Sequence, residues 1–546
     1  MNPEKGNNKV RASTRMFFSG VLILTICNIL EKAIGLLFKI PIVNIIGDEG
    51  MGYFNSAYTI YTWLYMISTS GLPVAVLILV SRSRAKGRFK ESRAIFRAAL
   101  SIFLALGAIG TAVMIFGANF FADKMMASAP TYLSIIAVAP TLFFICISSA
   151  MRGYFQGHQQ MLPTGVSHVI EAVCKLVIGI LFATWAIKRG CPIHEVAAYT
   201  ILGVTIGVFL GMVFLTVTKL LFREEKYNVE FLELANDEVA PRKTIYKNLI
   251  SIAIPITVSA SVTSLSSLID AVMVQNRLQS AMGYTQVEAT AIYGNYTSLA
   301  VPFFNLPPVV VYPIANAIVP LLSSAIVAAD RQRLAFLRGS AIRIVSMIGV
   351  PCAFGMSIMA EPILKLLFRE SAAEQAAPLL SILAPATLFL CLLAISNSIL
   401  QAHHKERVPI VSMLAGAIVK LVSNYILMGQ IGIYGTPIST VLCYVTAVTV
   451  NFYFIHRYVG KLPGIGSVFL RPILASLVAM AGCVGVYELG QMLLPGRITT
   501  VVAIGAAVVL YFVFIFLFKA ITKEEILLLP KGQKIYTILH RVQLVK

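Results

Sequence analysis

Two stretches of the sequence, residues 139–177 and 384–422, repeat each other without a gap. The matched pairs include Ala139/Ala384, Pro140/Pro385, Phe144/Phe389, Cys146/Cys391, Gln156/Gln401, His158/His403, Lys175/Lys420, Leu176/Leu421 and Val177/Val422. The pair Lys175 and Lys420 places a cation inside an apolar run in both copies. Because a charge in the hydrocarbon of a membrane is costly, ionisable residues there usually serve a function. The repeat therefore predicts two related lobes, each with a buried cation, as in two-lobed transporters.

Apolar residues make up 58% of the chain and charged residues only 12%, and the mean hydropathy is +0.82. Runs without Asp, Glu, Lys or Arg, such as 98–122 and 498–518, are long enough to cross a hydrocarbon core of roughly 30 Å as helices. The sequence predicts an all-α polytopic membrane protein with about 14 transmembrane helices. We place these helices near 16–42, 53–81, 95–117, 131–151, 164–187, 197–220, 248–275, 287–325, 340–360, 379–400, 408–429, 434–456, 468–488 and 497–519.

The second copy begins near the seventh helix, because Tyr53 and Asn55 recur as Tyr293 and Asn295. An even number of helices per copy gives two parallel six-helix repeats, which form two lobes around a shared cavity, and two extra C-terminal helices. The expected parts are an N-terminal tail (1–15), the first lobe with helices 1–6 (16–222), a linker (223–247), the second lobe with helices 7–12 (248–458), helices 13 and 14 (459–519) and an amphipathic tail (520–546).

The net charge of +20 follows the predicted topology. Most of the 44 Lys and Arg residues fall in alternate loops, beginning with the tail before helix 1 and the segment from Arg82 to Arg97. Basic residues concentrate on the cytoplasmic side of membrane proteins, so both termini and the linker are predicted to be cytoplasmic. This distribution excludes nucleic acid as a partner and points to contact with membrane lipids.

Helix 1 carries a polar stripe within its apolar sequence. At 100° per residue its members share one face, and they are Asn28, Glu31, Lys32 and Lys39. Such a stripe cannot face lipid, so we expect it to line a partner helix or a wet cavity. On helix 7, Asp270 shares a narrow arc with several hydroxyl residues. Glu31 and Asp270 are therefore candidates for ion coupling as well as for the transport cavity.

Helix 5 carries Glu171 and Lys175 four residues apart, and Lys175 and Lys420 both fall near the middle of their helices. A structural alternative is that Glu171 neutralises Lys175 on one helix face, while Lys39 snorkels to the interface. We favour a functional role for the two paired lysines, because mid-membrane cations cannot snorkel.

Two further sets of residues have both structural and functional interpretations. His158 and His403 sit in predicted cytoplasmic turns, where a structural role is favoured over proton transport. Tyr58, Tyr61 and Tyr65 share one face of helix 2, where they can stack on sugar rings or simply pack against neighbouring helices.

A motif around the end of helix 4 carries a family resemblance. The stretch Arg152, Gly153, Tyr154, Phe155, Gln156, Gly157, His158, followed by residues 167–171, closely resembles the stage V sporulation protein B-like branch of the multidrug/oligosaccharidyl-lipid/polysaccharide exporter superfamily. The segment 70–76 resembles the same branch. In this family the motif lies at a cytoplasmic turn, which assigns Arg152, Gly153, Gln156 and Gly157 to that turn. Family members typically carry Arg at the position of Lys175. This chain therefore keeps the positive charge there but lacks a guanidinium group, which can donate two parallel hydrogen bonds to one anion.

The resemblance implies a non-enzymatic flippase of the bacterial cytoplasmic membrane. Its substrate would be a polyprenyl-pyrophosphate-linked saccharide, such as the peptidoglycan precursor lipid II or a related lipid-linked oligosaccharide, moved by alternating access. No metal or cofactor is expected beyond a coupling ion, sodium or a proton, or the membrane potential. Lipid-linked saccharide and membrane lipids are the expected partners, and the chain is expected to act as a monomer.

Three other functions remain open. A cation-coupled exporter of drugs or metabolites would use the same fold, with the coupling ion at Glu31 and Asp270. A membrane enzyme fits less well, because no external loop gathers an acid-base set of side chains. A non-transporting scaffold for the cell envelope or the spore has no need of paired mid-membrane lysines.

Overall fold

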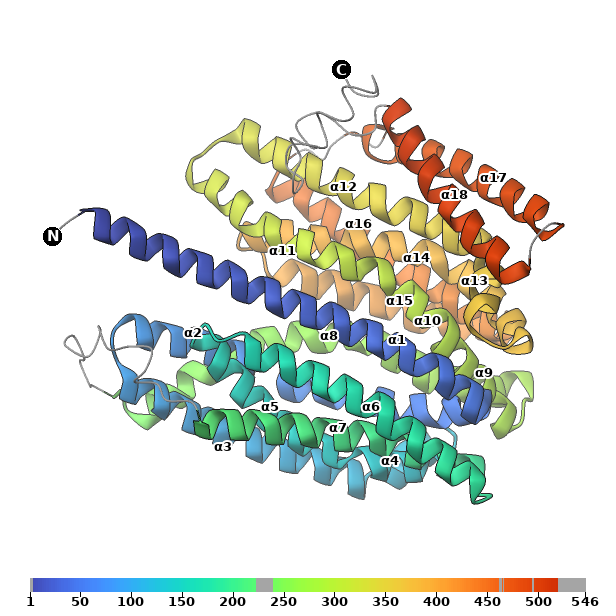
Figure 1. The fold of residues 1–546 in the computed structure, drawn as a ribbon, viewed down its shortest axis with the longest axis horizontal. Helices are drawn as coiled ribbons and strands as arrows, with labels where there is room; N and C mark the ends of the chain where they lie inside the picture. The colour runs from blue at the N-terminus through green and yellow to red at the C-terminus, as the bar shows by residue number, and fades with distance from the viewer. Residues whose placement is uncertain (1–2, 222–238, 461–463, 465, 493–494, 519–546) are drawn as a thin grey trace. The chain divides into compact units, whose positions relative to one another are not determined.

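The computed structural model describes residues 3–221, 239–460, 464, 466–492 and 495–518. Within these residues the chain is helical, with short turns and without β-strands. It divides into two compact units, the first unit (Met1–Gly294) and the second unit (Asn295–Lys546). Figure 1 gives the order of the helices along the chain.

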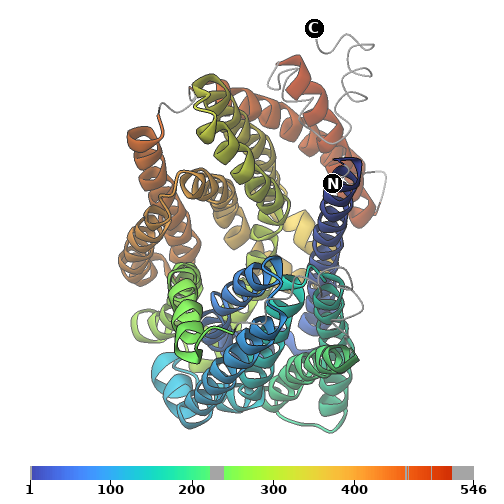
Figure 2. The same cartoon turned by 90° about the vertical axis from the view of Figure 1, so that its left-hand side faces the viewer.

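The first unit is built from long helices that run side by side, and Figure 2 looks nearly along them. They are α1 (Pro3–Thr69), α2 (Leu72–Ala85), α3 (Phe89–Phe116), α4 (Thr131–Val138), α5 (Pro140–Gly157), α6 (Leu162–Lys188), α7 (Ile193–Leu221), α8 (Arg242–Met282) and α9 (Gln286–Asn295), with a π-helical turn at Phe120–Met125. The helices α5, α6 and α7 pack on one another and on α1, and α8 packs against α1, α2 and α3.

The helix α1 contains the first predicted span and most of the second, joined at one glycine. Gly47 has a φ of 70°, in the left-handed region that glycine adopts without strain. The backbone reverses there, because the rings of Phe38 and Phe54 lie 6.0 Å apart, whereas an unbroken helix would separate them by about 24 Å. Two antiparallel segments of α1 therefore meet on either side of Gly47.

Three glycines at four-residue spacing join α6 and α7. A Cβ atom added to Gly203 would lie 2.6 Å from the backbone N of Gly179, and one added to Gly207 would lie 2.8 Å from the carbonyl oxygen of Glu171. One added to Gly211 would lie 2.7 Å from the Glu171 carboxylate. Small residues allow membrane helices to approach backbone to backbone. The glycines of α7 thereby fix the position of the α6 face that carries Glu171.

The second unit has its own core around α14. Its helices are α10 (Val301–Phe304), α11 (Leu306–Val327), α12 (Arg331–Ile358), α13 (Ala360–Leu367), α14 (Glu370–Ala402), α15 (Arg407–Ile431), α16 (Gly435–Tyr458), α17 (Arg471–Gln491) and α18 (Gly496–Leu517), with short turns at Tyr296–Ala300, Gly432–Tyr434 and Gly466–Leu470. The helix α14 packs against α11, α12, α13 and α16. The pair α17 and α18 (red in Figure 1) packs onto α12 and α13, where the Tyr511 hydroxyl donates to the Met347 carbonyl at 2.7 Å.

Eleven helical segments of the described chain are long and apolar enough to cross a membrane. Two of them, Ile26–Arg84 and Arg407–Tyr458, each overlap two predicted spans. The remaining predicted span lies in α8, so the set of about 14 predicted helices is consistent with the structure. The chain is a multi-pass, all-α membrane protein.

Several helix boundaries differ from the prediction, and prolines explain two of the differences. The predicted single helix 287–325 is divided into α9, a π-helical turn, α10 and α11, with Pro302 and Pro307 beside the breaks. The predicted helix 131–151 is divided before Pro140, and α5 then continues to Gly157. The helix α1 begins at Pro3, inside the predicted tail.

The division into units also differs from the division by repeats. The helix α8 begins at Arg242, so the end of the predicted linker is helical, and α8 belongs to the first unit. The assignment of the seventh helix to the second lobe rests on the repeat alone and stays a prediction. Residues 223–238 of the linker and the predicted amphipathic tail 520–546 lie outside the described residues.

Candidate functional site

The polar centre of the first unit is an ion pair between α5 and α6. Arg152 is 6% exposed, and its guanidinium donates to the carboxylate of Glu171. The Nε of Arg152 also donates to Ser167 Oγ at 3.1 Å, and that hydroxyl donates to the Thr164 carbonyl at 2.7 Å. A guanidinium group can donate two hydrogen bonds at once, and Ser167 holds that of Arg152 in place. Such a group is a strong partner for a buried carboxylate. The suggested pairing of Glu171 with Lys175 is therefore wrong, because Glu171 binds Arg152.

The position of Arg152 corrects a second expectation. Arg152, Gly153 and Gln156 were predicted to lie in a turn, but they lie in the last turns of α5, and the turn begins at His158. The glycines of this motif serve packing against α2. A Cβ atom at Gly153 would lie 2.7 Å from the Pro73 carbonyl oxygen, so the two helices touch along their backbones.

Gly157 continues the same contact between α5 and α2. A Cβ atom at Gly157 would lie 2.7 Å from the Val80 side chain. The two motif glycines thus hold the end of α5 against α2, and this fixes the point from which Arg152 reaches α6.

The polar stripe of α1 meets α6 one turn away from the ion pair. Glu31 Oε2 lies 3.5 Å from His168 Nδ1, and Glu31 Oε1 lies 3.5 Å from Lys32 Nζ. The Lys32 side chain is 62% exposed. His168 precedes Glu171 by three residues, so it shares a face of α6 with that carboxylate. Glu31 of the stripe therefore faces α6, whereas Lys32 and Asn28 are exposed, so that a wet cavity or a partner helix along the whole stripe stays a prediction.

Lys175 is held by aromatic rings. Its Nζ lies 4.9 Å from the ring centre of Phe38 and 4.8 Å from that of Tyr58, within the range of cation–π attraction. Lys175 is also repelled by the charge of Lys32 and attracted by that of Glu31, and Lys39 is repelled by the charge of Lys175. The contacts of Lys175 in the described residues are thus to rings, while the carboxylate on its own helix binds Arg152.

The ring of Tyr58 belongs to a column of aromatic side chains along α1. Successive ring centres lie 6.0 Å apart for Phe38 and Phe54, 5.9 Å for Phe54 and Tyr58, 5.6 Å for Tyr58 and Tyr61, and 6.0 Å for Tyr61 and Tyr65. Tyr61 is 6% exposed, whereas Tyr58 and Tyr65 are partly exposed. The contact of Phe38 with Phe54 joins the two segments of α1, and the other rings of the column lie along the second segment. A role of these tyrosines as sugar contacts stays a prediction.

The other predicted site residues occupy different surroundings. Asn28 is exposed on α1, and Lys39, the residue after Phe38 on the same helix, is half-buried. Asp270 is 8% exposed on α8 in the first unit, and Lys420 is 1% exposed on α15 in the second unit. The structure therefore brings Glu31, Lys32, Lys39, Glu171 and Lys175 together in the first unit, with Arg152 added to them.

The two histidines of the repeat have the same geometry. His158 Nδ1 lies 2.9 Å from the carbonyl oxygen of Tyr154, and His403 Nδ1 lies 2.9 Å from that of Ile399. Each contact spans four residues and closes the end of a helix. This equivalence confirms the repeat at the level of side chains and agrees with a structural role for both histidines.

Burial lowers the pKa of His158 to about 3, and the neighbouring charges of Arg84 and Lys219 lower this pKa further. An imidazole with such a pKa is neutral near pH 7. His158 is therefore neutral at that pH, with one ring proton and without the second proton of an imidazolium.

Sequence reasoning missed the partner of Glu171, the contact of His168 and the glycines of α7. The glycines had a signal, since Gly203, Gly207 and Gly211 form a small-xxx-small pattern. The ion pair joins positions 19 residues apart on different helices, which no local spacing predicts. Among the described residues, no group of three His, Cys, Asp or Glu side chains is arranged to hold a metal ion.

The sequence of the chain matches two family profiles. The profile described as "Polysaccharide biosynthesis protein" matches residues 17–326, and the MatE profile matches residues 255–426. Stage V sporulation protein B of Bacillus subtilis (strain 168) is 27% identical over 427 residues, 78% of this chain and 80% of that protein. The lipid II flippase MurJ of the same strain is 25% identical over 522 residues, 90% of this chain and 94% of that protein.

Solved structures of low sequence identity share the fold. MurJ in its inward closed conformation has a TM-score of 0.67 at 14% identity, with 91% of this chain and 98% of that chain covered. An inward-facing MATE family multidrug resistance transporter has a TM-score of 0.65 at 15% identity, with 78% and 93% covered. Because the profile match extends over more than half of the sequence, this chain belongs to the polysaccharide biosynthesis protein family.

Proposed function

We propose that this chain is a flippase that moves a polyprenyl-pyrophosphate-linked saccharide, lipid II or a related lipid-linked oligosaccharide, across the bacterial cytoplasmic membrane by alternating access. It acts without chemical change to the substrate, and as a monomer with both termini in the cytoplasm. The observation that carries the proposal is Lys175, a cation held between two aromatic rings rather than by a carboxylate. The likeness to the two Bacillus subtilis relatives named above supports it.

The charges around Lys175 favour an anionic substrate. The neighbouring cations Lys32, Lys39 and Arg152 join Lys175, against the carboxylates of Glu31 and Glu171. Four cations against two carboxylates leave a formal surplus of two positive charges. A pyrophosphate group needs several cations held in one place, and the ion pair of Arg152 with Glu171 keeps Lys175 available to supply one.

A second candidate is a cation-coupled exporter of drugs or metabolites, supported by the MatE profile over residues 255–426. In that function Glu31 and Asp270 bind the coupling ion, sodium or a proton. Glu31 lies beside Lys32 and His168, so a cationic drug at Glu31 would meet a neighbouring lysine. This charge pattern ranks drug export below transport of an anionic lipid.

The test is translocation of the headgroup of fluorescent lipid II in proteoliposomes. The variants are Lys175→Gln and Lys420→Gln, and Lys188→Gln is the matched control, because Lys188 is an exposed lysine on the same helix as Lys175. We expect translocation by the wild type and by the control, and its loss in both site variants while the fold stays intact.

Other outcomes test the assignment of the two lysines separately from the flippase function. Translocation that survives both substitutions removes the two lysines from the pathway but keeps the flippase. A folded wild type that moves no lipid II, other lipid-linked saccharide or lipid-linked pyrophosphate, but extrudes an organic cation in exchange for sodium or protons, overturns the proposal in favour of drug export.

A further inference from the structure

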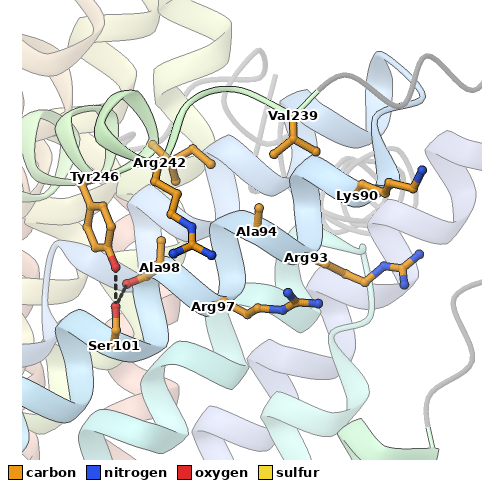
Figure 3. A pocket seen from close by; sticks show the side chains of 10 residues that line it. Lys90, Arg93, Ala94, Arg97, Ala98, Ser101, Val239, Arg242 and Tyr246 are labelled. Atoms are coloured by element: carbon orange, nitrogen blue, oxygen red, sulfur yellow. Dashed lines mark hydrogen bonds between the residues drawn. The ribbon is translucent and has the colours of Figure 1, made fainter.

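A second basic site lies in the first unit, between the first turns of α3 and α8. A cavity of about 490 Å³ opens there, and Figure 3 shows its side chains. Lys90, Arg93 and Arg97 reach it from α3, and Arg242 reaches it from α8. None of these residues belongs to the proposed transport site.

The charged side chains that line this cavity are all positive. Its ten lining residues, all described by the structure, include four cations and no Asp or Glu. The nearest acid along α3, Glu91, lies 3.7 Å from Arg88 on the same helix. Arginine presents its N–H groups as a planar fork that matches phosphate oxygens in pairs. The α8 end of the cavity also lies at a helix N-terminus, which favours a negative charge.

The end of the cavity away from the cations is neutral and polar. Ser101 of α3 and Tyr246 of α8 share a hydrogen bond of 2.8 Å there, which joins the two helices (Figure 3). Beneath the cations, Ala98 and Ile245 are buried and form part of the core of the unit. The site is therefore built on two packed helices.

Further along the same helix faces the surface becomes aliphatic. Leu104, three residues after Ser101, is 38% exposed. Ile250 and Ile254, four and eight residues after Tyr246, are 46% and 56% exposed. Along each helix, cations are followed by a hydroxyl and then by exposed aliphatic side chains, which is the order of phosphate, glycerol ester and acyl chain in a phospholipid.

From this order we propose that the cavity binds one anionic phospholipid. The phosphate lies among Arg93, Arg97 and Arg242, the glycerol region lies beside the Ser101–Tyr246 pair, and the acyl chains follow the aliphatic faces of α3 and α8. The basic end of these helices is the end predicted to be cytoplasmic, where anionic lipids attract basic residues. Because α8 packs on α2 and α3, such a lipid bridges helices of the first unit.

The first experiment measures binding of phosphatidylglycerol to the purified full chain by native mass spectrometry, with phosphatidylcholine for comparison. In the variant Arg97→Gln/Arg242→Gln we expect affinity for one phosphatidylglycerol to fall about 30-fold, because each basic residue near an anionic lipid contributes about fivefold. Both arginines are exposed, so the fold should tolerate the change. Thermal unfolding checks this, and Arg97→Lys/Arg242→Lys, which keeps both charges, should retain most of the binding.

The matched control is Arg82→Gln/Lys86→Gln, which removes two exposed cations from the end of α2 without touching the cavity. Equal losses in the two double variants, or no preference of the wild type for phosphatidylglycerol, would overturn the site. The source of the phosphate is tested with dihexanoyl phosphatidylglycerol and with inorganic pyrophosphate. The lipid proposal requires the long-chain lipid to bind at least tenfold more tightly than either. Tighter binding of pyrophosphate would make this a site for a soluble phosphate compound and overturn the lipid proposal.

Discussion

The two units carry equivalent positions with different polar partners. At the spacing of 245 residues, Arg152 and Glu171 of the first unit correspond to Asn397 and Gly416 of the second unit, while Lys175 corresponds to Lys420. The repeat thus keeps the lysine and loses both members of the ion pair together. Losing only one would leave a buried charge without its partner, which is strongly destabilising.

The second unit fills the place of the ion pair with amides. Asn451 of α16 donates to Asn397 Oδ1 at 2.7 Å and to Ser396 Oγ at 2.9 Å. The glycine that allows close approach of the two helices lies on α15 in the second unit. A Cβ atom at Gly416 would lie 2.6 Å from the carbonyl oxygen of Cys443 on α16. In the first unit α6 supplies the polar group and α7 the glycines, whereas in the second unit α16 supplies the polar group and α15 the glycine.

The aromatic column distinguishes the units as well. At the repeat spacing of 240, Tyr58, Tyr61 and Tyr65 correspond to Ser298, Val301 and Asn305, so the column belongs to the first unit alone. The comparison teaches that duplication preserved the cation and the close packing of helices. The ion pair and the aromatic column beside Lys175 were not preserved at the equivalent positions of the second unit.

The largest effect is expected for the buried ion pair. Arg152→Ala leaves Glu171 buried without its cation, and we expect a loss of about 3–5 kcal/mol in the free energy of unfolding. Asn397→Ala, at the equivalent position, removes neutral hydrogen bonds and should cost about 1 kcal/mol. Denaturant titration of the two variants measures the difference. Equal losses would mean that the charged and the amide clusters are energetically alike.

Close packing should be equally important in both units. Gly207→Ala and Gly416→Ala each introduce a methyl group against a carbonyl of the neighbouring helix, and each should destabilise the protein by about 1–3 kcal/mol. Gly505→Ala is the control, because nothing lies within 4 Å of a Cβ atom there. A destabilised control, or site variants as stable as the wild type, would refute the packing account.

Acid should expose a difference between the two repeat histidines. The folded-state pKa of His158 is about 3, below its value of about 6.5 in the unfolded chain. Below pH 6.5 the unfolded chain binds a proton that the folded chain does not, so stability falls as the pH falls, by about 1.4 kcal/mol per pH unit until the pH approaches 3.

The thermal midpoint of His158→Asn should therefore depend less on pH between 6.5 and 4 than that of the wild type. His403→Asn serves as the comparison, because His403 makes the same backbone contact from a more exposed turn. If the pH dependence of His158→Asn equals that of the wild type, the buried neutral imidazole is not its source.

The smallest expected effect concerns the rings around Lys175. Tyr58→Leu removes one cation–π contact and should cost about 0.5–2 kcal/mol, while Tyr58→Phe keeps the ring and should be nearly neutral. Repeating both substitutions in a Lys175→Gln background isolates the contact. The difference between Leu and Phe should shrink there. An unchanged difference would assign the effect to packing of the column.

The sequence was sufficient to predict the elements that obey local rules. Apolar runs predicted the spans, and the repeat predicted that the turns at His158 and His403 are alike, because these features depend on neighbouring residues. Breaks beside Pro140, Pro302 and Pro307 also had a visible signal, although the predicted boundaries ignored them. The transport role of the paired lysines stays a prediction.

The arrangement of the site depended on contacts between helices. The spacing of Glu171 and Lys175 suggested a local pair, but the geometry between α5 and α6 offered Glu171 a guanidinium with a better fit. Likewise, Lys90, Arg93 and Arg97 were predicted to belong to a basic loop. They line a cavity because α8 packs beside α3, and the sequence did not predict this packing. Such pairings follow from packing, which composition and periodicity do not specify.

The reversal of α1 at Gly47 has a mechanical consequence for the cation beside it. Phe38 and Tyr58, the two rings that contact Lys175, come from opposite sides of that glycine. Any motion that opens the two segments of α1 must draw one ring away from the ammonium group. The ammonium group of Lys175 thus links the two segments of α1 through its contacts with both rings. A ligand that competes for the charge of Lys175 would also weaken this link.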